Sequence, residues 1–344
     1  MDASPTGRRI AVVGAGISGL AAARAVLARE PGARVSVLES AGRIGGVVAA
    51  AQLAGLVVDT GADRLLAHRP AATDLARDVG LEPDLQAPAT LPRSLLSGGA
   101  LVRLPARGIS GIPTDLAEVA RSGVLDRAAL ARLPLDHVLA RTGLEEDVAV
   151  GAYVRARLGR AVVDRLVAPL LAEVHAADVD SLSMRATMPA LYAAAGRDRS
   201  LLRAARVVEA DTPPGPRHLG LRGGLSRLPA ALAAAVVERG GTLRLGTTVR
   251  ALTRTGTGWR LVLGSAADPD QLTVDSVVLA VPAAAAGRLL APVSAPAAAI
   301  LREVRHASVA TVTLAYRSSE LTGPGVDPLP ARDDGGFVVA SDGT

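Results

Sequence analysis

Short apolar runs and stretches of helical composition alternate at the start of the chain. Residues 10–13 form an apolar run with the length of a buried parallel strand, and residues 34–38 have the pattern of a second strand. The stretch between them, which ends near Arg29, is rich in Ala and Leu and favours a helix. The first part of the chain therefore predicts a strand–helix–strand unit, the repeating element of α/β folds.

The remaining pattern predicts several further elements. The expected strands and hairpins cover residues 47–59, 93–105, 242–253, 260–263, 272–281 and 308–316. Helical periodicity covers residues 71–80 and most of 114–205, and further helices are expected from Ser226 to about Glu238 and from about residue 297. Residues 206–217 contain several prolines and predict a linker.

The turn after the first strand has a glycine pattern typical of dinucleotide binding. It consists of Gly14, Ala15, Gly16, Ile17, Ser18 and Gly19. The first glycine allows a tight turn, the second lets a pyrophosphate approach bare backbone, and the third permits close helix–strand packing. Because free N–H groups and the positive dipole end meet at the helix start, a phosphate is favoured there.

The residues after the second strand narrow the choice of nucleotide. Glu39 follows Gly19 at the spacing of about 20 residues that is expected for a carboxylate accepting from ribose hydroxyls, with Ser40 beside it. Arg43 can offset pyrophosphate charge, and the backbone of Gly45 and Gly46 is bare enough for an isoalloxazine ring to lie against it. This pattern resembles FAD-dependent oxidases of the amine oxidase, phytoene desaturase and protoporphyrinogen oxidase superfamily, so FAD is expected rather than NAD.

The superfamily resemblance implies two further cofactor contacts. The turn formed by Gly61, Ala62, Asp63 and Arg64 matches one that lies beside the flavin, although an ordinary glycine turn is an equal alternative from these residues alone. Val249 matches a strand position whose backbone contacts the adenine side, whereas its side chain alone predicts a core residue.

Composition excludes several classes of function. Hydrophobic residues make up 49% of the chain but aromatic residues only 1%, so the cores must consist mainly of Leu, Val and Ala. All 38 basic residues are Arg and are interspersed with acids, which gives no basic patch for nucleic acid.

The absence of Cys excludes disulfides and thiolate chemistry and fits a cytoplasmic protein. No run approaches the roughly 18 apolar residues of a bilayer span, which leaves a peripheral membrane contact open.

Four stretches of the middle region are similar to bacterial porphyrinogen oxidases of the coproporphyrinogen III oxidase branch, namely residues 111–116, 150–159, 163–171 and 180–189. The resemblance implies an α/β fold with a Rossmann-like FAD-binding domain, an α+β substrate domain and an inserted helical domain. The expected boundaries are 1–80 and 206–290 for the FAD domain, 81–110 and 291–344 for the substrate domain, and 111–205 for the helical domain. It also implies a C-terminal segment beyond Thr344 that completes the substrate sheet and the flavin site.

The resemblance implies oxygen-dependent oxidation of a porphyrinogen to a porphyrin in haem biosynthesis, with release of H₂O₂ and handover of the product to a ferrochelatase-type enzyme. Because the flavin carries the chemistry, it implies no catalytic side chain and no metal. By this resemblance, Arg93 matches a family arginine that pairs with a substrate carboxylate, and Arg69 lies where some coproporphyrinogen oxidases carry a basic residue; both are candidate substrate contacts. The residues do not decide between coproporphyrinogen and protoporphyrinogen as substrate. They do not decide the oligomeric state either.

One stretch departs from the family pattern. Where the family has a glycine-rich loop near the substrate, residues 172–178 read Ala-Glu-Val-His-Ala-Ala-Asp. Glu173 would bring negative charge near substrate carboxylates, and His175 is a candidate substrate contact, with a surface histidine as the alternative. Two other functions stay open: an inactive or flavin-binding-only fragment, and another oxidase such as a carotenoid desaturase.

Overall fold

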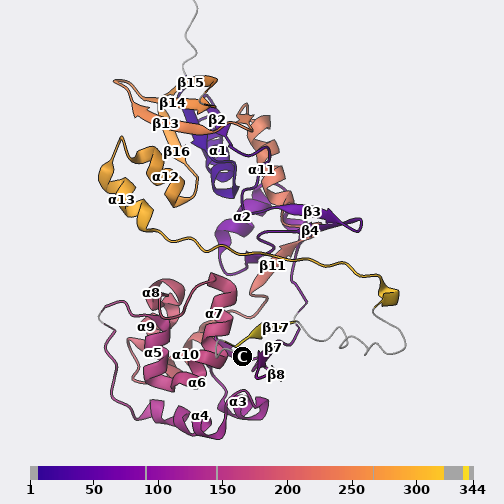
Figure 1. The fold of residues 1–344 in the computed structure, drawn as a ribbon, viewed down its shortest axis with the longest axis vertical. Helices are drawn as coiled ribbons and strands as arrows, with labels where there is room; N and C mark the ends of the chain where they lie inside the picture. The colour runs from indigo at the N-terminus through magenta and orange to yellow at the C-terminus, as the bar shows by residue number, and fades with distance from the viewer. Residues whose placement is uncertain (1–6, 90, 145, 266, 321–335, 341–344) are drawn as a thin grey trace, which may run out of the picture. The chain divides into compact units, whose positions relative to one another are not determined.

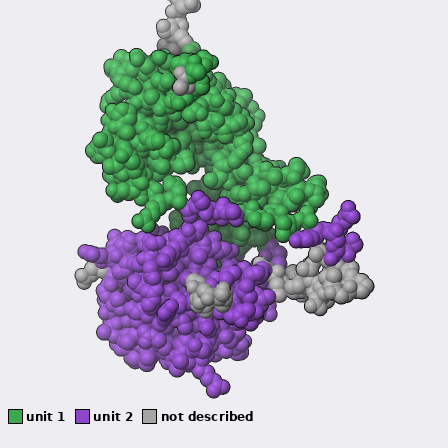
Figure 2. Space-filling view, viewed as in Figure 1, with its two compact units in different colours: residues 1–88, 216–306, 311–315 green, residues 89–215, 307–310, 316–344 purple. Residues whose placement is uncertain are grey.

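The computed structural model describes residues 7–89, 91–144, 146–265, 267–320 and 336–340 of the chain. These residues form two compact units (Figures 1 and 2). The first unit comprises residues 1–88, 216–306 and 311–315, and the second comprises residues 89–215, 307–310 and 316–344. The first unit is thus assembled from segments that lie far apart in the sequence. The finer division into substrate and helical domains stays a prediction.

A parallel sheet of four strands forms the centre of the first unit. Its order is β12 (Thr242–Arg244), β2 (Arg34–Leu38), β1 (Arg9–Val13) and β16 (Ser276–Leu279). Ile10 is paired with Val35 on one side and with Ser276 on the other. The expected strand–helix–strand start is confirmed, with α1 (Ile17–Arg29) between β1 and β2. The chain therefore has an α/β fold.

Both faces of this sheet are buried, as expected for central parallel strands. Ile10 and Val12 pack into one core with residues of α1 and α11 (Arg227–Glu238). Ala11 and Val13 point to the opposite face and pack into a second core. That core includes Leu252, Leu261 and Leu263 from an antiparallel sheet, which consists of β13 (Val249–Arg254), β14 (Trp259–Gly264) and β15 (Pro269–Val274).

The first unit also contains smaller elements around this centre. They are the hairpin of β3 (Ala50–Leu53) and β4 (Leu56–Asp59), the small sheet of β5 (Leu65–Leu66), β11 (His218–Leu221) and β6 (Leu85–Gln86), the 3-10 turn η1 (Glu82–Asp84), and the helices α2 (Pro70–Asp78), α12 (Ala283–Leu290) and α13 (Ala295–Glu303). A hairpin within residues 47–59, as expected, is thereby confirmed.

The second unit combines a helical core with two small sheets. The strands are β7 (Ser94–Ser97), β8 (Ala100–Arg103) and β17 (Phe337–Val339) in one sheet, and β9 (Gly108–Ile109) with β10 (Ile112–Pro113) in the other. The helices are α3 (Leu116–Ser122), α4 (Arg127–Arg132), α5 (Val150–Leu158), α6 (Arg160–Val162), α7 (Ala168–His175), α8 (Met184–Thr187), α9 (Pro189–Ala195) and α10 (Leu201–Asp211), with η2 (Leu133–His137) and the π-turn η3 (Val163–Val167) between them. Leu95, Tyr153, Met184 and Leu202 belong to one shared core.

Asp115 caps the start of α3. Its Oδ1 accepts hydrogen bonds from the backbone N–H groups of Ala117 at 2.9 Å and Glu118 at 3.1 Å. The bond from Glu118 is the main reason that the pKa of Asp115 lies below its ordinary value. Because these N–H groups have no partner within the helix, the carboxylate stabilises the helix start.

Five expectations about local structure are wrong. The linker expected over 206–217 begins later, because α10 continues to Asp211. The strand expected over 242–253 is interrupted by a turn in which Gly246 has φ 62°, and the one over 272–281 is interrupted at Asp275. Residues 304–317 contain no assigned strand. A strand needs a neighbour to receive its hydrogen bonds, and an alternating pattern alone does not supply one.

The fifth error concerns the segment expected as a loop near the substrate. Ala172 to His175 form the last turn of α7, and the helix ends where Ala176 takes a left-handed conformation with φ 47°. Ala and Glu have higher helix propensity than glycine, so a helical last turn is favoured by these residues.

A buried ion pair holds the helical core of the second unit together. Arg157 Nε donates to Asp136 Oδ1 at 2.7 Å, and the two side chains are only 2% and 0% exposed. Arg157 also donates to the carbonyl oxygen of Ala140 at 2.7 Å. The other oxygen of Asp136 accepts from Ser200 Oγ at 2.7 Å and from the N–H of Leu202 at 2.9 Å. The pair thus joins η2, α5 and the start of α10.

We expect Asp136→Ala to lower the free energy of unfolding by about 3–5 kcal/mol, because it leaves a buried guanidinium without its counter-charge. Urea unfolding followed by circular dichroism measures this change. Arg160 is the ion-pair partner of Asp164, and its side chain is 82% exposed. Arg160→Ala should therefore lower the free energy of unfolding by less than about 1 kcal/mol. Equal effects of the two substitutions would contradict the structural role of the buried pair.

Candidate functional site

The glycine turn lies between β1 and α1, as the sequence predicts. Gly14 has φ 106°, and a Cβ atom placed on it would lie 2.4 Å from the carbonyl oxygen of Ala280. A Cβ on Gly19 would lie 1.9 Å from the carbonyl oxygen of Gly14. Only glycine fits these two positions. Ile17 and Ser18 form the first turn of α1, whose N–H groups lack partners within the helix.

The second glycine pair contacts this turn directly. The N–H of Gly45 donates to the carbonyl oxygen of Ala15 at 2.9 Å, and Gly16 and Gly45 form an isolated parallel bridge. A Cβ on Gly46 would lie 3.3 Å from the Cα of Gly16. A Cβ on Gly16 would have only the Cα of Gly46 within reach, at 4.0 Å. The structure therefore brings the two predicted glycine motifs together around bare backbone.

The carboxylate of Glu39 is fixed at the end of β2. Its Oε2 accepts from the N–H of Ala15 at 2.8 Å, and its Oε1 accepts from the N–H of Ala41 at 2.8 Å. Ser40 Oγ donates to the same Oε1 at 3.2 Å. Glu39 is half-buried and lines a cavity. This is the geometry expected of a ribose-binding acid.

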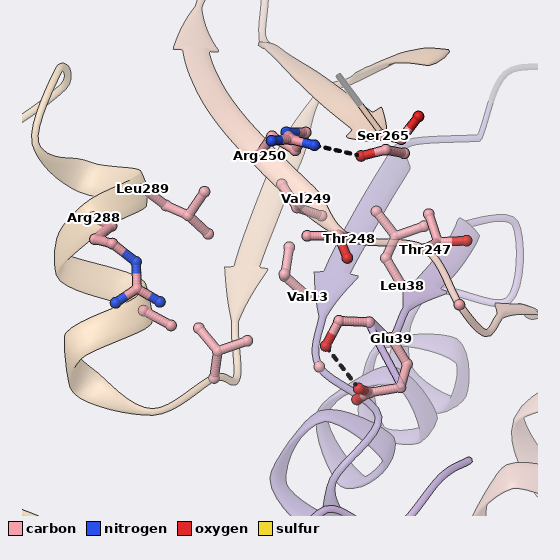
Figure 3. A pocket seen from close by; sticks show the side chains of 16 residues that line it. Val13, Leu38, Glu39, Thr247, Thr248, Val249, Arg250, Ser265, Arg288 and Leu289 are labelled. Carbon is pink, nitrogen blue, oxygen red and sulfur yellow. Dashed lines mark hydrogen bonds between the residues drawn. The ribbon is translucent and has the colours of Figure 1, made fainter. Parts of the chain in front are cut away.

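A cavity of about 690 Å³ opens beside Glu39 within the first unit. Figure 3 shows Glu39 at the end of β2, Val249 and Arg250 on β13 and Arg288 on α12 around it. Gly14 and Ser40 also line it, so the predicted positions Gly14, Glu39, Ser40 and Val249 share one cavity. Its size is in the range of cofactor sites.

Two charged residues of the cavity were missed by the sequence analysis. Arg250 and Arg288 line the cavity and bring positive charge to it, and Arg250 Nη1 donates to the carbonyl oxygen of Gly264 at 3.5 Å. Arginine is so frequent in this chain that neither position stands out in the sequence. Only the packing of α12 beside β13 shows where they lie.

The remaining predicted cofactor residues lie near the glycine pair. The N–H of Ala62 donates to the carbonyl oxygen of Val47 at 3.0 Å, and a Cβ on Gly61 would lie 2.0 Å from that oxygen. Asp63 and Arg64 form an exposed ion pair at 3.0 Å. These residues thus run beside the backbone that directly follows Gly46.

Arg43 lies outside the residues that line the cavity. Its side chain is exposed, and its Nη1 donates to the carbonyl oxygen of Ile44 at 3.3 Å. A role for Arg43 at the pyrophosphate stays a prediction.

The three predicted substrate residues belong to different units. Arg69 is exposed and precedes α2 in the first unit. Arg93 directly precedes β7 in the second unit and forms an ion pair with Glu173 of α7. His175 is exposed at the end of the same helix. The structure thus brings Arg93 together with the acid that the sequence marks as unusual.

The sequence matches the family model described as flavin containing amine oxidoreductase over residues 17–327, which is most of the chain. The chain belongs to this family. By its description, the members of this family are flavin-containing oxidoreductases. The glycine turn, the carboxylate of Glu39 and the adjacent cavity are compatible with a nucleotide of this family's flavin class.

Two curated relatives, both named coproporphyrinogen III oxidase, resemble most of the chain. The protein from Propionibacterium freudenreichii subsp. freudenreichii is 35% identical, with 89% of this chain and 63% of the relative covered. The protein from Mycobacterium tuberculosis (strain ATCC 25618 / H37Rv) is 33% identical, with 98% of this chain and 71% of the relative covered. The chain thus spans roughly two thirds of the length of these relatives.

One solved structure resembles the chain in both fold and sequence. It belongs to a protein from Exiguobacterium sp. 255-15 that carries a provisional protoporphyrinogen oxidase name, with a TM-score of 0.74 and 30% identity. The match covers 86% of this chain and 63% of that one.

Two further properties of the described residues bear on the site. No group of three or more His, Asp or Glu residues among them could hold a metal ion. In the same residues, no helix combines the length and the apolar character needed to cross a membrane.

We expect Gly19→Ala to destabilise the chain by about 1–3 kcal/mol, because the added methyl group would overlap the carbonyl oxygen of Gly14 and force β1 and α1 apart. Gly32→Ala is the matched control, since its Cβ meets nothing within 4 Å, and it should change stability by less than about 0.5 kcal/mol. Urea unfolding of both variants compares them. A Gly19→Ala variant as stable as Gly32→Ala would mean that the packing at this turn is looser than described.

Proposed function

We propose that this chain binds FAD in the first unit. The observation that carries this proposal is the contact between the two glycine motifs, in which Gly16 and Gly45 bring bare backbone together at the start of α1. The diphosphate would lie on the N–H groups at the helix start, and Glu39 would accept hydrogen bonds from the ribose. The adenine side would occupy the cavity beside Val249, where Arg288 and Arg250 supply positive charge.

We further propose that the substrate is a porphyrinogen, either coproporphyrinogen III or protoporphyrinogen IX, oxidised in haem biosynthesis. The names of the curated relatives support this class of substrate. Formation of the porphyrin removes six hydrogens from the macrocycle, in three two-electron steps. Bound FAD supplies the electron acceptor for each step, and O₂ as the final acceptor leaves as H₂O₂, so three O₂ molecules balance one porphyrin.

The residues of the chain would bind and orient the substrate in this reaction. A porphyrinogen combines an apolar ring with carboxylates, and arginine recognises a carboxylate through a planar pair of N–H donors. Arg93 is the candidate for this contact in the second unit, and Arg69 in the first. His175, a peripheral membrane contact and handover to a ferrochelatase-type enzyme stay predictions.

The test is anaerobic mixing of the FAD-loaded protein with each porphyrinogen, with the flavin absorbance followed over time. Bleaching of the flavin, and porphyrin fluorescence after O₂ is admitted, are the expected results. Flavin that is retained but not bleached by either porphyrinogen would contradict the oxidase function and favour a flavin-binding role. Protein without flavin after incubation with FAD would contradict the cofactor proposal.

We expect Gly16→Val to abolish FAD binding while α1 remains folded. A branched side chain at Gly16 would project into the open space in front of Gly46, where the diphosphate must approach the backbone. Flavin absorbance after gel filtration measures binding, and circular dichroism measures the helix content. Gly32→Val adds the same side chain where nothing lies within 4 Å and should retain FAD. Normal FAD affinity in Gly16→Val would remove the glycine turn from the site.

A further inference from the structure

An ion pair joins two elements of the second unit at the position where a substrate carboxylate is proposed to bind. Arg93 Nη2 contacts Glu173 Oε2, and the two side chains are 40% and 39% exposed. Neither charge is buried, so the pair is open to exchange with charged groups from solvent. This distinguishes it from the buried pair of Arg157 and Asp136 in the same unit.

The backbone on both sides of the pair is well anchored. The carbonyl oxygen of Arg93 accepts from the N–H of Leu104 at 2.8 Å, and the next residue begins β7, which pairs with β8 and β17. On the other side, Glu173 is part of α7, whose Leu171 is buried in the helical core. α7 also contacts β17, the strand that pairs with β7. The two side chains therefore meet because their elements are packed together.

Glu173 supplies a counter-charge to Arg93 through their ion pair. The nearest ionisable neighbour on the same helix is His175, which is exposed at the helix end. Glu173 therefore already supplies Arg93 with a carboxylate, and an incoming carboxylate must displace it. The chain thus carries a group of the same chemistry as the proposed ligand, at the site where the ligand would bind.

We propose that Glu173 is a specificity-determining residue that competes with a substrate carboxylate for Arg93. This inference rests on the proposed porphyrinogen function. Its consequence is a penalty on carboxylate-rich ligands: a porphyrin with four carboxylates meets more repulsion from Glu173 than one with two. Glu173 would therefore reduce the preference for the tetracarboxylic over the dicarboxylic macrocycle without touching the reacting carbons.

The experiment measures binding of two stable porphyrins by fluorescence, with coproporphyrin III carrying four carboxylates and mesoporphyrin IX carrying two. The proteins are the FAD-loaded wild type, Glu173→Gln, Arg93→Gln and the double variant. We expect Glu173→Gln to tighten coproporphyrin III binding by about three- to five-fold, the range of an exposed ion pair, and mesoporphyrin IX binding by less than about two-fold. In the Arg93→Gln background the gain should disappear, because the competition needs both partners.

Asp180→Asn is the matched control. It removes the acid of the exposed pair between Arg155 and Asp180, which has a distance of 2.8 Å and exposed fractions of 40% and 46%. Asp180→Asn makes the same change in net charge as Glu173→Gln. If both variants change coproporphyrin III binding equally, the effect comes from overall charge, and the inference is overturned.

The remaining outcomes separate the two proposals. A gain from Glu173→Gln that persists without Arg93, or no gain at all, overturns the competition while the porphyrin function stands. If neither the wild type nor Glu173→Gln binds either porphyrin, the porphyrinogen proposal itself is contradicted, and the inference fails with it.

Discussion

The first unit depends on close backbone contact between two glycine motifs, one of which precedes β2 in the sequence while the other follows it. The N–H of Gly45 bonds to the carbonyl oxygen of Ala15, and the Cα atoms of Gly16 and Gly46 leave no room between them for a Cβ on Gly46 without some movement. A Cβ on Gly45 would lie 2.4 Å from the carbonyl oxygen of Val48, and one on Gly46 would lie 3.3 Å from the Cα of Gly16, so side chains at these two positions would disturb the contact. The absence of side chains keeps polar N–H groups accessible, and a phosphate needs such groups.

Charged side chains from three elements, β2, β13 and α12, lie around the cavity beside this backbone. Glu39 accepts from the N–H of Ala15 at one end of the cavity, while Arg250 and Arg288 line its wall. A nucleotide offers hydroxyl donors and negative phosphates, so the carboxylate of Glu39 and the guanidinium groups of the two arginines would each have a partner in it. The cavity thus combines hydrogen-bond acceptors and positive charge within reach of one ligand, in a family whose members contain flavin.

The second unit contains two arginine–carboxylate pairs with opposite consequences. Arg157 and Asp136 are almost fully buried and bonded to backbone groups, so loss of either leaves an uncompensated charge in the core. Arg93 and Glu173 are substantially exposed, so water and incoming anions compete with their attraction. The same chemistry therefore stabilises the fold at one place and is available for exchange at the other.

The sequence by itself determined the strands and helix of residues 9–38, the glycine turn and the position of Glu39, because each depends on local periodicity or short spacing. Tertiary structure decided what depends on segments far apart in the chain. Residues 308–316 have a strand pattern but no assigned strand, while Glu173 lies on a helix rather than a loop and contacts Arg93. Arg250 and Arg288 face the cavity only because β13 and α12 pack there. Pairing partners and side-chain neighbours arise from packing, which local sequence patterns do not encode.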